Sequence, residues 1–172
     1  MRWETALIDY KIYLRLERGL SENSIESYGY DVQRFIDYIK LNNEKTTPLS
    51  CKKEHIQDFV YTIAKTVNPR SQARQISGLK SFFNFMIFEG YRDDSPLDLI
   101  DSPKIGRKLP DVLQVNEIEK IISCIDLSMP LGHRNSAIIE TLYGSGLRVS
   151  ELINLRISDI HFDESLLLVT GK

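Results

Sequence analysis

The stretch YGSGLRVSELINL, residues 143–155, contains residue types that could grip a phosphate. Two glycines precede Arg148, and Glu151 follows it three positions later, one helical turn further on. The arginine fork can hold two oxygens of one phosphate, and a helix N-terminus adds partial positive charge at the same point. Phosphoryl transfer needs such a group because charge builds up on the non-bridging oxygens. The alternative is an ordinary turn into a helix whose arginine points to solvent.

A second candidate lies earlier in the chain, where no acidic residue occurs between Asp58 and Glu89. A helix is expected over residues 69–89, and at about 100° per residue its two faces differ. The apolar face would carry Ile76, Leu79, Phe83, Met86 and Ile87. The opposite face would carry Arg70, Ala73, Arg74, Ser77, Lys80, Ser81 and Asn84. A small, basic, hydrogen-bonding face can enter a DNA major groove. A solvated face that happens to lack acids is the alternative, although solvated faces usually prefer charged helix formers.

These residues need elements that position them, and the first part of the chain reads as helical. Helices are expected over residues 5–18, 21–43 and 52–65, where apolar residues recur at helical spacing. Ser21 fits an N-cap, and Leu20 can pack on Ile25 as a hydrophobic staple. With the helix over 69–89 they predict a four-helix bundle over residues 1–92.

Proline and glycine then interrupt the periodicity at Pro96, Pro103, Gly106 and Pro110, which predicts an interdomain linker over 93–109. A second domain is expected over 110–172, with three helices followed by the strand SLLLVTGK. This strand needs a partner because a lone strand is unstable. Either a strand from elsewhere pairs with it, or the chain is cut short; we expect the second.

Bulk composition restricts the class of protein. Apolar residues make up 42% of the 172 residues and charged residues 27%, as in soluble globular proteins. The formal net charge of −2 gives no global indication of nucleic-acid binding, but local charge is a separate matter. Cys51 and Cys124 are far apart and in no metal-ligand spacing, which is typical of a reducing cytoplasmic environment. The sequence has no signal peptide and no apolar run of membrane-spanning length.

Several ordered motifs together resemble the tyrosine recombinases, and within them the bacterial Xer type and its XerD branch. The segments GLSENSIESYGYDVQRFIDYI and RSQARQISGLKSFFNFMIFEG resemble the second and fourth helices of the family's core-binding domain. The segment SPLDLIDSPKIGRKLPDVLQVNEIEKII resembles the linker and the start of the catalytic domain. The most specific piece, YGSGLRVSELINLRISDI, resembles the box that holds the first catalytic arginine, and LLLVTGK resembles the strand leading to the catalytic lysine.

The resemblance implies a mainly α fold: a SAM-like four-helix core-binding domain, then the helical first part of a catalytic domain with the start of a β-hairpin. It implies strand cleavage by a tyrosine nucleophile through a 3′-phosphotyrosyl intermediate, with no metal and no cofactor. Four protomers, of this protein or of this protein with a paralogue, would act on double-stranded DNA carrying inverted repeats. A DNA translocase is a further expected partner. The implied process is chromosome dimer resolution or mobile-element integration, in the cytoplasm and not at a membrane.

The same resemblance implies roles for individual residues. Arg148 would clamp the scissile phosphate, Lys172 would be the general acid for the leaving 5′-oxygen, and Glu151 would support the arginine. The DNA-contacting residues would be Arg70, Arg74, Ser77 and Lys80.

The sequence departs from the family pattern after Lys172, where the family has a His-x-x-Arg box and the nucleophile. None of the three histidines makes that box, and all eight tyrosines precede Arg148. We therefore expect a chain truncated within the catalytic domain, which binds DNA but cannot cleave it alone. Two other hypotheses stay open: a non-catalytic DNA-binding module that competes with the full-length recombinase, and a helical interaction protein unrelated to DNA.

Overall fold

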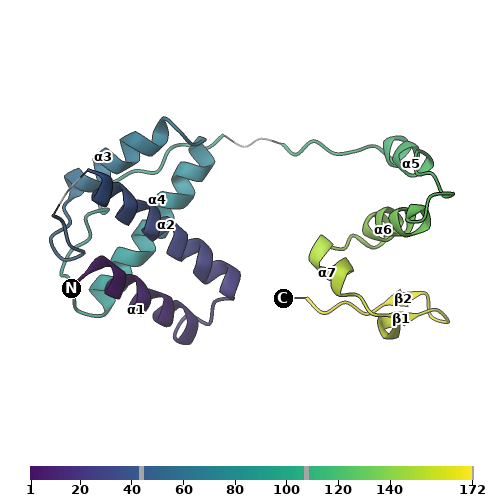
Figure 1. The fold of residues 1–172 in the computed structure, drawn as a ribbon, viewed down its shortest axis with the longest axis horizontal. Coiled ribbons are helices and arrows are strands. Elements are labelled where there is room, and N and C mark those ends of the chain that lie inside the picture. Colours follow the sequence, from purple (N-terminus) through teal and green to yellow (C-terminus); the bar gives the residue numbers. More distant parts are fainter. Residues whose placement is uncertain (43–44, 107–108, 172) are drawn as a thin grey trace. The chain divides into compact units, whose positions relative to one another are not determined.

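The structure is a computed structural model that describes residues 1–42, 45–106 and 109–171. The chain divides into two compact units, residues 1–107 and 108–172. The first contains α1 (Trp3–Leu16), α2 (Glu22–Leu41), α3 (Lys53–Ala64) and α4 (Pro69–Phe88). The second contains α5 (Val115–Ser123), α6 (Gly132–Ser145), α7 (Val149–Asn154), the 3-10 helix η1 (Ile157–Asp159), and strands β1 (Ile160–His161) and β2 (Leu166–Leu167). The expected fold class is confirmed: a four-helix unit, then helices that lead into a short hairpin (Figure 1).

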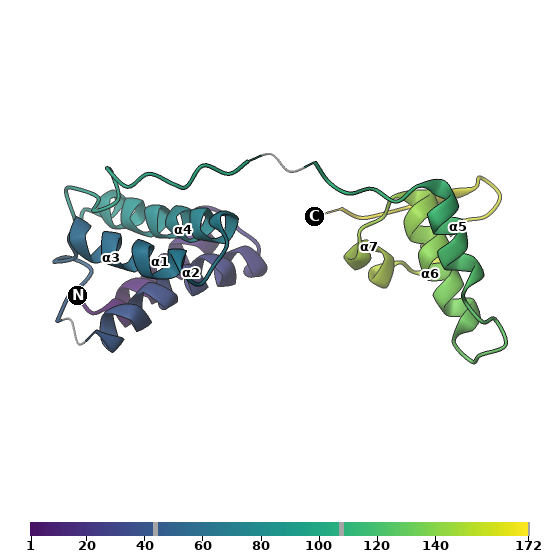
Figure 2. The same ribbon diagram turned by 90° about the horizontal axis from the view of Figure 1, so that it is seen from above.

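The four helices of the first unit enclose one hydrophobic core. Helix α4 lies across the other three helices and packs against α1, α2 and α3 (Figure 2). Asn68 caps α4, since its side chain accepts a hydrogen bond from the backbone N–H of Ser71, and Pro69 occupies the first turn. The helix buries Ile76, Leu79, Phe83 and Met86 as expected from their spacing, and it also buries Phe82 and Phe85. The buried aliphatic and aromatic side chains of α4 therefore anchor the helix that carries the exposed basic residues.

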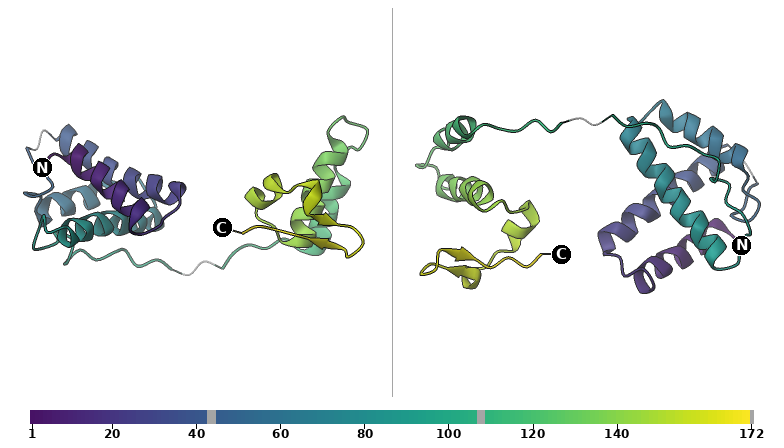
Figure 3. Two further views of the ribbon diagram at one scale, coloured as in Figure 1. Left: turned by 90° about the horizontal axis from the view of Figure 1, so that it is seen from below. Right: turned by 180° about the vertical axis from the view of Figure 1, so that it is seen from behind.

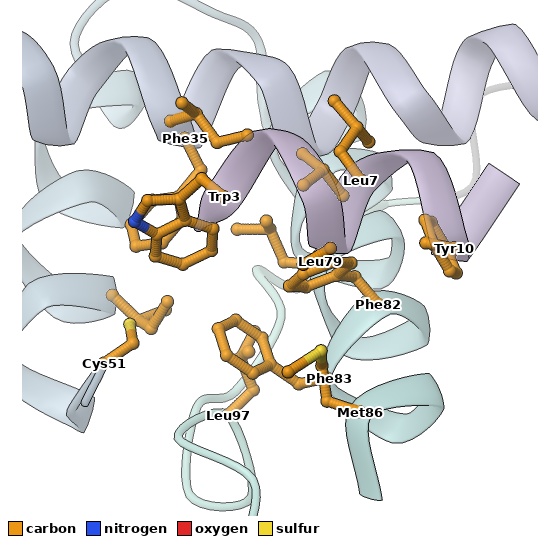
Figure 4. Packing of buried hydrophobic residues seen from close by; sticks show 14 of the residues in the cluster. Trp3, Leu7, Tyr10, Phe35, Cys51, Leu79, Phe82, Phe83, Met86 and Leu97 are labelled. Atoms are coloured by element: carbon orange, nitrogen blue, oxygen red, sulfur yellow. The ribbon is translucent and has the colours of Figure 1, made fainter. Parts of the chain in front are cut away.

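Trp3 is at the centre of the aromatic part of this core (Figure 4). Its ring centroid lies 5.5 Å from that of Phe35, 6.1 Å from Phe82 and 6.4 Å from Phe83. Its indole N–H donates a 2.8 Å hydrogen bond to the carbonyl of Thr46. One side chain therefore joins α1, α2, α4 and the loop before α3.

The segment after α4 continues the first unit for some residues. Leu97 and Ile100 are buried in the same core as the four helices, although the sequence places them in the linker expected over 93–109. Apolar side chains at these two positions can dock on the bundle despite Pro96, because a proline fixes the local backbone without preventing burial of its neighbours.

The second unit ends in a hairpin whose strands the sequence analysis did not pair. Strand β2 runs antiparallel to β1, with Ile160 opposite Leu167 and His161 opposite Leu166 (Figure 3). The backbone N–H of Leu168 also donates to the carbonyl of Asp159 at 2.8 Å. Of the strand expected over SLLLVTGK only Leu166 and Leu167 form β2. Their partner is the segment immediately before the acidic turn, whose two residues are too few to show an alternating pattern.

Burial differs sharply between the two units. All the buried hydrophobic residues of the described chain lie between Trp3 and Ile100. In the described part of the second unit Gly132 alone is buried. No helix in the described ranges is long and apolar enough to cross a membrane.

Candidate functional site

Arg148 stands at the junction between α6 and α7. Helix α6 ends at Ser145, and its C-cap residue Gly146 adopts the left-handed backbone conformation with φ of +63°. Glycine takes this conformation without the steric cost that a Cβ would bring. The chain then turns directly into α7, with Arg148 as the N-cap residue. The glycine-rich turn thus sets Arg148 at the start of a helix, as the sequence predicts.

Glu151 holds Arg148 through two hydrogen bonds of different kinds. Its Oε2 accepts from the Arg148 backbone N–H at 2.8 Å, and its Oε1 accepts from Arg148 Nη1 at 2.7 Å. These bonds, the backbone one first, lower the pKa of Glu151. The Glu151 side chain is only 14% exposed, whereas that of Arg148 is 78% exposed. The carboxylate therefore orients the arginine from one side and leaves most of the guanidinium open to a ligand.

A pocket of about 300 Å³ adjoins this pair and lies wholly within the second unit. Its walls come from α7, from Asp159, and from the segment that follows β2. Thr170 and Gly171, which directly precede Lys172, line the same pocket as Arg148. The hairpin is what brings them there, because the turn between β1 and β2 reverses the chain towards α7.

Lys172 itself, expected to be the general acid, lies outside the described residues. Among residues 1–42, 45–106 and 109–171, no group of three or more His, Cys, Asp or Glu side chains is arranged to hold a metal ion. The two cysteines are not joined to each other: Cys51 is buried and Cys124 exposed.

The exposed side of α4 is the second candidate surface. Arg70, Arg74 and Ser77 are exposed, and Lys80 is half-buried. Ser81, which the sequence analysis assigned to the same outer face, instead contacts the core, since its hydroxyl pairs with the Tyr10 hydroxyl at 2.8 Å. Ser81 is therefore half-buried, because Tyr10 of α1 covers that edge of α4.

Arg74 is not a free surface arginine. Its Nη1 and Nη2 donate to the two carboxylate oxygens of Asp31 at 2.8 and 2.7 Å, and Nη1 also donates to Ser27 Oγ at 2.9 Å. Asp31 is 1% exposed. Burial raises the pKa of Asp31 to about 6, although the Arg74 guanidinium acts in the opposite direction. The pair forms a bidentate bridge from α2 to α4.

Gly78 makes room for this bridge. A Cβ at position 78 would lie 2.5 Å from Asp31 Oδ2 and 2.7 Å from Asp31 Cβ. Neither residue is among the site residues predicted from the sequence, although each gave a signal: Asp31 precedes the core residue Val32, and Gly78 interrupts a helix beside the core residue Leu79.

We expect Gly78→Ala to lower the free energy of unfolding by about 1–3 kcal/mol, as overpacking does in a close-packed interior. Alanine favours a helix by about 1 kcal/mol over glycine, so the net loss must come from the clash with Asp31. Urea denaturation followed by circular dichroism measures it.

Gly29→Ala is the matched control, in the interior of α2. A Cβ there would meet the far end of the Lys11 side chain, which can swing away. We expect this variant to be as stable as the parent or more stable. Equal stability changes in the two variants would contradict the role given to Gly78.

Comparison with known proteins gives these surfaces a context. Residues 7–90 match the profile of the phage integrase N-terminal SAM-like domain. Residues 111–172 match the profile of the phage integrase family, and this range includes Arg148, Glu151 and the hairpin. The chain belongs to the phage integrase family of tyrosine recombinases.

Several bacterial proteins named tyrosine recombinase XerD are similar to this chain. The chain is 37% identical over 165 residues to tyrosine recombinase XerD of Listeria monocytogenes, a match covering 95% of this chain and 56% of that protein. It is 37% identical over 166 residues to XerD of Lacticaseibacillus casei, covering 96% and 56% respectively. For XerD of Staphylococcus aureus the identity is 35% over 170 residues, covering 98% and 57%. The chain thus spans little more than half the length of the relatives it matches.

This chain also matches a solved structure, a crystal structure of XerA recombinase. The match covers 99% of this chain and 56% of that one, with 25% sequence identity and a TM-score of 0.47.

Proposed function

We propose that this chain binds double-stranded DNA as part of a site-specific tyrosine recombinase, with Arg148 gripping the scissile phosphate. The observation that carries the proposal is the Arg148–Glu151 pair. The Arg148 side chain is 78% exposed, its guanidinium is bound from one side by the Glu151 carboxylate, and it lines a pocket. Such an arrangement suits an anion with two oxygens in reach, because a bidentate arginine recognises phosphate by geometry as well as by charge.

The reaction that the family membership suggests is transesterification at phosphorus. A tyrosine oxygen would attack the phosphate and form a 3′-phosphotyrosyl bond, while the bond to the 5′-oxygen breaks and that oxygen takes a proton. Arg148 would stabilise the charge on the non-bridging oxygens. Lys172 is the proposed proton donor and Glu151 the supporting residue. All eight tyrosines precede Arg148, so we expect the nucleophile to lie outside these 172 residues.

The proposed division of labour follows the two units. Residues 1–92 would be the core-binding domain, with Arg70, Arg74, Ser77 and Lys80 of α4 in or near the major groove. Residues 93–109 would connect it to the portion of the catalytic domain in 110–172. The proposed substrate is a duplex with inverted repeats, bound by four protomers of this protein or of this protein and a paralogue. A DNA translocase is a proposed further partner, and chromosome dimer resolution or integration is the proposed process.

Binding of the 172-residue chain to duplex DNA, measured by fluorescence anisotropy at several salt concentrations, tests this proposal. With four phosphate contacts, affinity should fall about a hundredfold between 50 and 200 mM salt. Arg148→Ala should bind more weakly and reduce the slope of log affinity against log salt by about one. No binding, or binding indifferent to salt, would contradict the proposal and favour a protein-interaction role.

Arg134→Ala is the matched control. Arg134 is also an exposed arginine of the second unit, on α6, and it does not line the Arg148 pocket. This variant should keep the parent slope. If Arg134→Ala and Arg148→Ala changed the slope equally, the Arg148–Glu151 pair would have no special part in binding phosphate.

A further inference from the structure

The bridge between Asp31 and Arg74 uses only part of the arginine. A guanidinium has five N–H groups. Nη1 donates both of its hydrogens, to Asp31 Oδ2 and to Ser27 Oγ, and Nη2 donates one to Asp31 Oδ1. Nε–H and the second hydrogen of Nη2 are left over, and both have no acceptor among the described residues. These two hydrogens lie side by side on one edge of the planar group.

The unused edge belongs to an accessible side chain. Arg74 keeps 47% of its side-chain surface exposed, while its Asp31 partner keeps 2%. The buried carboxylate and Ser27 thus fix the guanidinium on the α2 side. Two parallel donors remain for a ligand, in the geometry that matches a pair of neighbouring acceptors.

Helix α4 places cationic residues but no carboxylate near Arg74. No acidic residue occurs between Asp58 and Glu89, and Arg70, Ser77 and Lys80 occupy neighbouring turns of the same helix face. Asp31 neutralises much of the charge of Arg74. Arg70 and Lys80 therefore provide most of the long-range attraction for DNA. Arg74 contributes mainly through its directional hydrogen-bond donors.

We propose that Asp31, with Ser27, is a positioning residue for DNA recognition: it presents the Nε and Nη2 edge of Arg74 to two adjacent acceptors of a DNA duplex. This inference rests on the proposed function. The acceptors are two oxygens of one phosphate or the O6 and N7 atoms of one guanine, which share the same two-acceptor chemistry. Pre-orientation favours binding because an arginine held by three hydrogen bonds has little side-chain freedom left to lose.

Arg74→Lys is the first test, because lysine can keep the ion pair with Asp31 but has no two-donor edge. The probe is a pool of duplexes randomised over about two helical turns of DNA, bound to the 172-residue chain and sequenced after selection. We expect Arg74→Lys to stay folded and to lose about tenfold in affinity for the selected duplexes. Arg15→Lys is the matched control, since Arg15 on α1 pairs with Glu22; it should bind like the parent.

Asp31→Asn tests the positioning itself. It should weaken binding by a similar factor. The double variant Asp31→Asn with Arg74→Lys should bind no more weakly than Arg74→Lys alone, because both changes remove the same oriented two-donor edge. Circular dichroism verifies folding, and Ser27→Ala replaces Asp31→Asn if that variant unfolds, with a smaller expected loss.

The pattern of loss identifies the acceptor. A uniform loss over all sequences indicates a phosphate; a loss confined to duplexes with guanine at one position indicates the base. Parent-like affinity and selection in Arg74→Lys would overturn the inference and leave the bridge a purely structural tie. If the parent chain itself fails to bind any duplex, the proposed function fails first.

Discussion

Trp3→Ala should reduce the free energy of unfolding of the first unit by about 3–5 kcal/mol, as removal of a large buried aromatic side chain usually does. Trp3 is 6% exposed and meets three phenylalanine rings within 6.4 Å. The core cannot collapse readily onto the void, since its neighbours are rigid rings from α2 and α4. Small domains have a total stability of about 5–15 kcal/mol, so this one change could remove much of it.

Chemical denaturation followed by circular dichroism is the suitable measurement, because Trp3 is the single tryptophan and the variant loses its fluorescence. Trp3→Phe separates the two contributions of the residue. It keeps an aromatic ring but loses the N–H bonded to Thr46, and about 1 kcal/mol of its cost should come from that bond. Leu16→Ala is the control, since Leu16 on the same helix is 75% exposed; a loss as large as that of Trp3→Ala would refute the central place of Trp3.

Arg92→Ala should cost about 3 kcal/mol, because several backbone carbonyls would lose a charged donor at once. Arg92 is an arginine that lies inside the fold: its side chain is 7% exposed. Its Nη1 donates to the carbonyls of Pro48, Leu49 and Cys51, at 2.8, 3.1 and 2.9 Å. The guanidinium carbon also lies 5.5 Å from the centre of the Phe83 ring. This residue ties the loop before α3 to the segment that follows α4.

Arg92→Lys distinguishes charge from shape. Lysine retains the positive charge but cannot reproduce the planar fork, so we expect about half the loss seen for alanine. Arg18→Ala, at an exposed arginine after α1, should change the stability by less than about 0.5 kcal/mol. A fully stable Arg92→Lys variant would show that charge alone holds the loop. The same denaturation experiment as for Trp3 measures all three variants.

The helical architecture and the Arg148 turn follow from local features of the amino-acid sequence. Helices α2, α3 and α4 follow from apolar spacing, and Pro69 and Gly90 mark the ends of α4 within a residue or two. The relation of Gly146, Arg148 and Glu151 was also readable, since a left-handed helix end and a hydrogen bond between residues three apart depend on the local backbone. Everything in that turn lies within six residues of chain.

Polar groups that are far apart in the sequence meet only through the packing of the helices. The partners Asp31 and Arg74 are 43 positions apart, and Arg92 finds its carbonyls 41 to 44 positions earlier. Periodicity assigns a residue to a face of its own helix, but it does not say which neighbour covers that face. The helical spacing places Arg74 and Ser81 only on the polar face of their own helix, and the packing of α1 and α2 on α4 gives each of them a partner.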